Sequence, residues 1–295
     1  MPVRSRSQMW FQGINMLFFL IISIVMVIPL IYVLSVSLTS DSDIVQYGYS
    51  LVPKHITSTA YTYLMKTPKQ IINAYAITII VTVLGTALSL ILTTTVAYVM
   101  TRRDYRYHRI TTFYIFFTMI FNGGLVPTYM VVTKILHLQD TLFALFLPYG
   151  VSAWFAMLMR GFLMSMPFEV IESAKIDGAS ELRIFTTIIV PLSKPALATV
   201  GLFYALAYWN DWWLAMLYIS NDNLVPLQYL LQSIMANLEH LTSHVQAGLN
   251  INLDQIPGES ARMAIAVLAI GPMMFVFPFF QKYIVRGLTL GAVKG

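Results

Sequence analysis

The chain has 295 residues, of which 58% are hydrophobic and 11% are charged. Because a soluble domain carries about 25% charged residues, this composition excludes a protein that faces water on all sides and predicts an integral membrane protein. The absence of cysteine excludes disulfides and thiolate metal sites, and the net charge of +5 has to be explained by where the cations lie along the chain.

Six apolar stretches are each long enough to cross the roughly 30 Å hydrocarbon core of a bilayer, which takes about 20 helical residues. They lie at 14–38, 74–100, 110–132, 142–164, 196–219 and 263–285. The sequence therefore predicts an all-α integral membrane protein with six transmembrane helices, in which the whole chain, 1–295, forms one domain.

The first span follows Arg4 and Arg6, a pattern that signal peptides share. Its apolar region of about 25 residues exceeds the roughly 7–15 of a signal peptide, and no A-x-A cleavage site follows. We therefore expect an uncleaved anchor, with Trp10 and Phe11 in the aromatic belt at the headgroups.

Most of the 18 Lys and Arg residues fall on one side of the membrane if the amino terminus is cytoplasmic. The densest group is the short loop TRRDYRYHR between the second and third spans. By the positive-inside rule, both termini and the connection 165–195 are expected in the cytoplasm, and the loops 39–73 and 220–260 outside. The basic loop is better explained by stop-transfer than by a nucleic-acid or lipid patch, so no nucleic-acid partner is expected.

The third span is the least regular of the six. It contains Asn122-Gly123-Gly124 and Pro127, and glycine and proline in membrane helices often mark kinks. A packing kink and a gating hinge both fit this pattern, and the first is the simpler of the two.

The charged stretch 169–195 between the fourth and fifth spans is the most informative feature of the chain. Glu169 and Glu172 suit the first turns of a helix, where the dipole favours negative charge. Gly178 suits the left-handed residue that ends a helix. A second helix from about Ser180 would carry the apolar stripe Leu182, Phe185 and Ile189 and end at Pro191 and Pro195. Such a helix–turn–helix could transmit force to a docked partner, or it could lie flat on lipid.

No segment fits a catalytic or nucleotide-binding role. The phosphate-cradling pattern G-x-x-x-x-G-K-[ST] does not occur in the chain. We expect no catalytic residues, no enzyme activity and no cofactor on this chain, so any energy for transport would come from another protein.

The fifth span carries candidate substrate contacts. A carboxylate at the bilayer centre costs about 2.5–3.5 kcal/mol, so Asp211 is expected to face a pore or a polar partner. The sequence predicts that Tyr204, Tyr208 and Asp211 share one helical face. The alternative is an aromatic belt with a structural hydrogen bond. The candidate path residues are Tyr204, Tyr208, Asn210, Asp211 and Trp212.

The outer loop 220–260 has mixed polarity and includes His240 and His244, four residues apart. Two histidines at this spacing can bind a metal on a helix, but a site needs further ligands. We expect no metal here.

At 172–191 the chain resembles the EAA motif of the permeases of ABC importers. The pattern is E-A-A, three residues, Gly, nine residues and I-x-L-P, and it occurs as Glu172-Ser173-Ala174, Gly178 and Ile188-Ile189-Val190-Pro191. Ser173 replaces an alanine and Val190 a leucine. Asp177-Gly178-Ala179 is similar to the carbohydrate branch of the family, whose best-known member imports maltose.

Two further segments extend the resemblance over nearly the whole chain. The ending FPFFQKYIVRGLTLGAVKG resembles the carboxy-terminal signature of the carbohydrate branch. FNGGLVPTYMVV, at 121–132, resembles the subgroup that takes up complex oligosaccharides such as pectin- or alginate-derived pieces.

The resemblance implies a type I ABC importer permease fold with a cytoplasmic helix–turn–helix coupling loop, in the bacterial plasma membrane. It implies a heterodimer with a second, homologous permease, two ATPase subunits that bind ATP and Mg²⁺, an extracellular solute-binding protein and an oligosaccharide substrate. The residues expected to couple to the ATPase are Glu172, Ser173, Ala174, Asp177, Gly178 and Ala179.

Two other functions remain open at this point. An ABC permease for a non-sugar solute would share the EAA motif. An ion-coupled secondary transporter would show intramembrane acids or broken helices in two halves of an internal repeat, and the sequence shows no such repeat.

Overall fold

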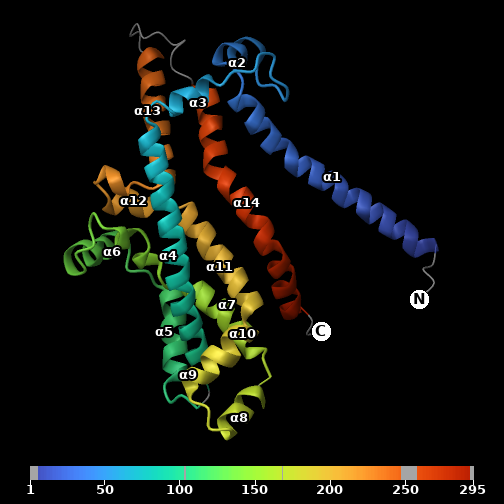
Figure 1. Ribbon diagram of the computed structural model, residues 1–295, viewed down its shortest axis with the longest axis vertical. Helices are drawn as coiled ribbons and strands as arrows, with labels where there is room; N and C mark the ends of the chain where they lie inside the picture. Colours follow the sequence, from blue (N-terminus) through green and yellow to red (C-terminus); the bar gives the residue numbers. More distant parts are fainter. Residues whose placement is uncertain (1–5, 103, 168, 247–257, 293–295) are drawn as a thin grey trace. The chain divides into compact units, whose positions relative to one another are not determined.

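The computed structural model describes residues 6–102, 104–167, 169–246 and 258–292. The described residues are mostly helical, and their one extended pairing is an isolated bridge between Thr39 and Ile56 (Figure 1). The chain divides into two compact units, 1–68 with 233–271 and 69–232 with 272–295. Helices α13 (Leu227–Gln246) and α14 (Glu259–Ala292) each contribute to both units.

The first unit contains a long apolar helix and the start of the loop 39–73 that follows it. Helix α1 (Arg6–Ser37) leaves most of its described apolar side chains exposed, as a membrane-facing helix does, and only its last turn, with Val36, is buried. After α2 (Asp41–Tyr47) and α3 (Thr59–Leu64) the chain enters the second unit. The Asp41 carboxylate accepts hydrogen bonds from the backbone N–H groups of Gly258 and Ser260, and so holds the start of α14.

The second unit is built around α4 (Pro68–Thr101), which packs against α11 (Lys194–Trp209). Buried hydroxyl groups join the two helices, because Ser89 lies 2.8 Å from the Tyr208 hydroxyl and Thr93 lies 2.7 Å from that of Tyr204. Gly85 permits this approach, since a Cβ there would lie 2.8 Å from the Tyr208 ring.

Three helices are long and apolar enough to cross a membrane alone, in α1, α4 and the described start of α14. Three further pairs of consecutive helical stretches pass the same test when each pair is taken together. Each pair is bent by more than 40° at a short break. The described part of the chain thus has up to six spans. The expected spans 14–38, 74–100 and 263–285 lie within or close to single helices: α1, α4 and α14.

The other three expected spans are broken. The third consists of α5 (His108–Ile120), α6 (Leu125–Met130) and the π-helical η1 (Val131–Ile135), with a bend of 115°. The break falls at the predicted irregularity, where Gly124 has a φ of 86°. This is far more than a packing kink. Every residue of α5 is at least partly exposed.

The fourth expected span, 142–164, is wrong as one helix. It begins with the 3₁₀ turns η2 (Leu142–Leu145) and η3 (Leu147–Tyr149), and only α7 (Ala153–Met164) is α-helical. Pro148 lies inside the second turn, and Ser152 caps α7 by accepting a hydrogen bond from the N–H of Phe155. The bend between the two parts is 53°.

The fifth expected span, 196–219, is also wrong as one helix, because α11 ends at Trp209 and α12 spans Trp213–Tyr218. Two polar side chains explain the break. Asn210 donates to the Leu206 carbonyl oxygen at 2.8 Å, and Asp211 accepts from the Leu214 N–H at 3.1 Å. Short polar side chains compete in this way with the helical ladder.

The loop 220–260 is more ordered than the sequence suggested. It contains the short η5 (Asp222–Leu224) and the 20-residue helix α13. The side chain of His244 and residues 247–257 lie outside the described part. For the carboxy-terminal signature only the helical backbone to Ala292 is described, together with the Pro278 side chain, and 293–295 lie outside.

Candidate functional site

The stretch 165–195, called the coupling loop from here on, forms the two helices that the sequence predicted. Helix α8 spans Glu169–Ile176, and the second helical stretch comprises α9 (Glu181–Ile184), the π-helical η4 (Phe185–Ile189) and α10 (Val190–Leu192). In the second unit they lie at the end where α4 stops and α5 begins (Figure 1). The chain then bends by 79° into α11 at Ser193.

Gly178 ends α8 in the left-handed conformation that the sequence predicted, with a φ of 76°. Its N–H donates to the Lys175 carbonyl oxygen, and the N–H of Ala179 donates to the Ala174 carbonyl oxygen, both at 3.0 Å. These two bonds are the Schellman motif, which satisfies the last free carbonyl groups of a helix. The turn is therefore fixed by the left-handed conformation of Gly178 and by these two backbone hydrogen bonds.

Ser180 begins the second helical stretch, as predicted, because its hydroxyl accepts a hydrogen bond from the N–H of Arg183. The predicted apolar stripe is shifted. Leu182 is 72% exposed, whereas Ile184 is completely buried and Ile189 nearly so. The π-helical turn after Ile184 adds one residue to the repeat, which moves the buried face.

Four charged side chains form a closed ring that joins the coupling loop to the end of α4. We call Arg102, Asp104, Lys175 and Glu181 the ion-pair ring. One terminal nitrogen of Arg102, Nη2, lies 2.8 Å from both Asp104 Oδ2 and Glu181 Oε1. The Lys175 ammonium contacts the same two oxygens, at 3.0 Å for Glu181. Each cation thus meets both carboxylates.

Three members of the ring have shifted pKa values, and all three lie outside the membrane-spanning segments. The hydrogen bond from Lys175 lowers the pKa of the Asp104 carboxyl below its ordinary value, and the same bond raises the pKa of the Lys175 ammonium. Burial raises the pKa of Glu181, but hydrogen bonds from Tyr98 and Lys175 outweigh it and the net direction is down. Asp104, Lys175 and Glu181 are therefore charged at neutral pH.

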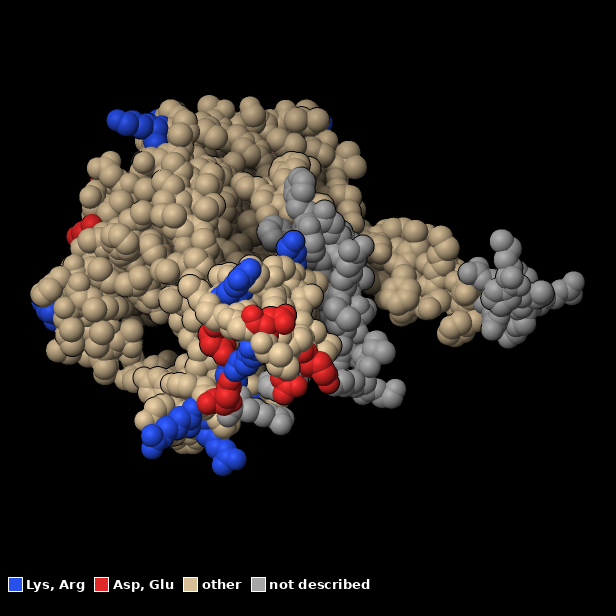
Figure 2. Space-filling model, turned by 60° about the horizontal axis from the view of Figure 1, so that its bottom comes forward, with Lys and Arg blue, Asp and Glu red and all other residues tan. Residues whose placement is uncertain are grey.

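The predicted coupling residues lie on the free side of the loop, except for the two alanines. Glu172, Ser173, Asp177 and Gly178 are exposed, Ala179 is half-buried, and Ala174 is buried against the rest of the unit. Figure 2 shows acidic and basic side chains gathered on this face of the molecule. The arrangement is a compact polar knob whose inner side is packed and whose outer side is open.

Sequence reasoning missed two features of this knob. Ile176 and Leu182 expose 86% and 72% of their surface on either side of the Gly178 turn. The ion-pair ring was also missed, since Arg102 was interpreted only as a topology signal. Its one sequence signal is a run of mixed charge, Lys175, Asp177 and Glu181, which could pair with the basic loop after the second span.

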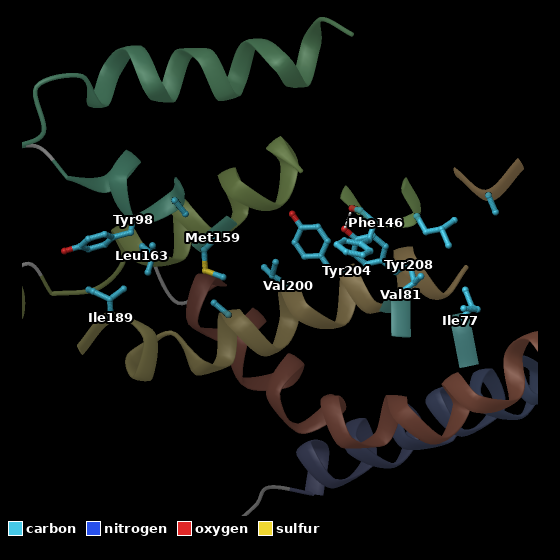
Figure 3. Close-up of a cluster of buried hydrophobic side chains, with 14 of the residues drawn as sticks. Ile77, Val81, Tyr98, Phe146, Met159, Leu163, Ile189, Val200, Tyr204 and Tyr208 are labelled. Carbon is cyan, nitrogen blue, oxygen red and sulfur yellow. Dashed lines mark hydrogen bonds between the residues drawn. The ribbon is translucent and has the colours of Figure 1, made fainter. Parts of the chain in front are cut away.

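The candidate path residues of the fifth span are not one surface. Tyr204 and Tyr208 are each 2% exposed and pack within the unit (Figure 3). The Tyr204 hydroxyl accepts a hydrogen bond from the Ser152 N–H, and the Tyr208 hydroxyl donates to the Phe146 carbonyl oxygen. The expectation of a shared helical face with Asp211 is wrong, because the helix ends between them. Asn210 and Trp212 are exposed at the break.

The fold and the site together define the class of the protein, a helical membrane permease with an exposed polar knob. The family described as binding-protein-dependent transport system inner membrane component matches residues 94–290. The chain belongs to this family.

Two relatives from Bacillus subtilis cover nearly the whole chain. Protein LplC is 36% identical over 285 residues, which is 97% of this chain and 95% of LplC. The polygalacturonan/rhamnogalacturonan transport system permease protein YtcP is 36% identical over 284 residues, which is 94% of this chain and 96% of YtcP. The relatives are thus similar in both length and sequence.

A solved structure is similar over 96% of this chain and 100% of its own, with a TM-score of 0.77 and 31% identity. It is the crystal structure of a bacterial ABC transporter involved in the import of the acidic polysaccharide alginate. The chain therefore has the fold of an ABC importer permease. It is a membrane-embedded transport subunit and not an enzyme, and it works with an ATPase and a solute-binding protein.

Proposed function

We propose that this chain forms half of the translocation path of an ATP-driven importer for a complex oligosaccharide. The observation that carries the proposal is the near-complete match to two sugar importers, YtcP and the alginate transporter, at 36% and 31% identity. Both act on polymers that contain uronic acids. An oligosaccharide from such a polymer is the substrate class that this similarity favours.

The chain would pair with a second, homologous permease to enclose the path, and two ATPase subunits would each receive one coupling loop. Both termini and the coupling loop would lie in the cytoplasm, as the positive-inside rule requires. ATP and Mg²⁺ would bind to the ATPase subunits, and this chain would hold no cofactor of its own. Glu172 and Asp177 would be the charged contacts to the ATPase, and Ala174 a close-packing position.

On the outer side, the loop 220–260 would contact the solute-binding protein. Its long helix α13 is amphipathic, with Leu227, Leu230, Leu231 and Leu238 buried and Glu239 and His240 exposed. Asn210, Asp211 and Trp212, at the helix break between α11 and α12, would line the path. A polar, unwound point in a membrane helix is tolerated where it faces a cavity or protein.

The proposal is tested by reconstituting the chain with its second permease, ATPase and binding protein in liposomes. Uptake is measured for oligogalacturonides, rhamnogalacturonan and alginate oligosaccharides, with maltooligosaccharides and an amino acid as controls. We expect ATP-dependent uptake of at least one uronic-acid oligosaccharide. Uptake of the amino acid alone, or uptake driven by an ion gradient without ATP, would contradict the proposal.

A further inference from the structure

The ion-pair ring is balanced in charge and partly withdrawn from water. Arg102 is 5% exposed, and its second terminal nitrogen, Nη1, is buried with no hydrogen-bond partner among the described residues. Removing one partner from a buried ion pair is strongly destabilising, because an uncompensated charge is left behind. The buried guanidinium therefore depends on the two carboxylates that accept its hydrogen bonds.

The ring is reinforced by packing on its inner side. The Tyr98 hydroxyl donates to Glu181 Oε2 at 2.8 Å, and the Tyr98 and Phe185 rings lie 5.2 Å apart. Arg160 of α7 donates to the Met100 carbonyl oxygen at 3.4 Å. The last turns of α4 thus contact both the second helical stretch of the loop and α7.

The closed shape of the ring matters for its mechanics. An isolated exposed ion pair contributes little, whereas a network of several charges contributes more. Here the loss of any one contact leaves each member with another partner. Arg102 and Asp104 follow the end of α4, Lys175 belongs to α8 and Glu181 to α9, so the ring ties the connection after α4 to both helices of the loop.

We propose that the ion-pair ring is a rigid clamp, which makes both helices of the coupling loop move as one body with the end of α4. Arg102 and Lys175 are then positioning residues for the coupling of ATP hydrolysis to transport. This inference rests on the proposed function. Without the clamp, a displacement of α8 would bend the chain at the ends of the loop and would not move α4.

The first test is a substitution series at the ring in the reconstituted complex. Lys175→Arg keeps the charge, Lys175→Gln removes it and Lys175→Glu reverses it. The readout is sugar transported per ATP hydrolysed. Because substitutions in a coupling network change coupling by about 0.5–2 kcal/mol, we expect the ratio to fall by about 2- to 30-fold for Gln and further for Glu, and to stay near wild type for Arg.

Asp104→Asn is the second variant, because Asp104 lies outside the coupling loop. It should lower the same ratio while the amount of ATPase that co-purifies stays unchanged. If both the Lys175 and Asp104 variants lose the ATPase instead, the ring acts in docking and the clamp is overturned. Unchanged ratios in Lys175→Glu and Asp104→Asn would overturn it equally.

A third readout does not depend on any sugar. The chain has no cysteine, so spin labels can be placed at Tyr105→Cys and Ser173→Cys, both exposed positions. A rigid clamp predicts one narrow distance distribution that ATP does not change, and a broad one after Lys175→Glu. If the wild-type complex transports no oligosaccharide, the proposed function fails, while this distance still decides the clamp.

Discussion

Lys175 and Glu181 lie on opposite sides of the Gly178 turn, and their charged atoms Nζ and Oε1 are 3.0 Å apart. This contact closes the two helices of the coupling loop onto each other. The same two residues also reach Asp104 and Arg102 at the end of α4. The knob is therefore defined by a backbone turn at its tip and by charges at its base.

The Gly178 turn gives the first prediction. With a φ of 76°, Gly178 adopts a conformation that costs a side-chain-bearing residue about 1 kcal/mol or more. We expect Gly178→Ala to reorient α8 against α9 and to lower the amount of ATPase that co-purifies with the complex. The control is Gly161→Ala in α7, where a Cβ meets no atom within 4 Å. Equal ATPase recovery from both variants would show that the turn is not needed for docking.

The pH dependence of the ring follows from the sign of the Asp104 shift. Its pKa is lowered from the ordinary value of 3.8 by the bond from Lys175, so its contribution to stability is present above that value and is lost as pH falls through the folded pKa. We expect Asp104→Asn to lower the thermal unfolding midpoint at pH 7. The difference from wild type should shrink below about pH 4. A difference that stays constant between pH 7 and pH 3 would exclude this ionisation as its source.

The contact between α4 and α11 predicts that alanine lowers stability much more at one glycine than at another. A Cβ at Gly85 would lie 2.8 Å from Tyr208 and 3.0 Å from the Cβ of Phe146, whereas one at Gly201 would lie 3.0 Å from the flexible end of Leu90. Overpacking a rigid site costs about 1–3 kcal/mol. Gly85→Ala should lower the unfolding temperature of the purified protein clearly, and Gly201→Ala less. The reverse order would contradict the packing described here.

The sequence predicted the elements whose signals are local. Gly178 and Ser180 were assigned correctly because a left-handed residue and a helix cap depend on a few neighbours. The continuous spans of α1 and α4 followed from apolar length alone.

The sequence did not predict features that depend on competing or distant groups. The break after Trp209 arises because Asn210 and Asp211 satisfy backbone groups locally, which hydropathy does not record. The roles of Tyr204 and Tyr208 were misjudged, since their hydroxyl partners lie on α4 and near the start of α7. The ring joins residues about 80 positions apart, as in Arg102 and Glu181, and no local pattern shows that pairing.

The exposed apolar tips of the knob predict a docking effect. Ile176 is 86% exposed, which is costly in water unless a partner covers it. We expect Ile176→Asn to reduce ATPase recovery and ATP hydrolysis by the purified complex. Val45→Asn on α2 is the matched control, because Val45 is 88% exposed in a loop predicted to lie outside. If the two variants recover equal amounts of ATPase, Ile176 does not take part in docking.

Variants of Asp211 distinguish a structural role of its carboxylate from a role in the translocation path. Its carboxylate accepts from the Leu214 N–H at 3.1 Å and so caps α12. Asparagine keeps an oxygen for this bond and removes the charge, whereas alanine removes both. If the charge contacts substrate, Asp211→Asn and Asp211→Ala should both reduce oligosaccharide uptake, while ATPase recovery stays unchanged. If only the cap matters, Asp211→Ala should lower the unfolding temperature, by the equivalent of about 1 kcal/mol, and Asp211→Asn should retain uptake. Because Asp211→Asn removes the charge and keeps the cap, uptake by this variant decides between the two roles.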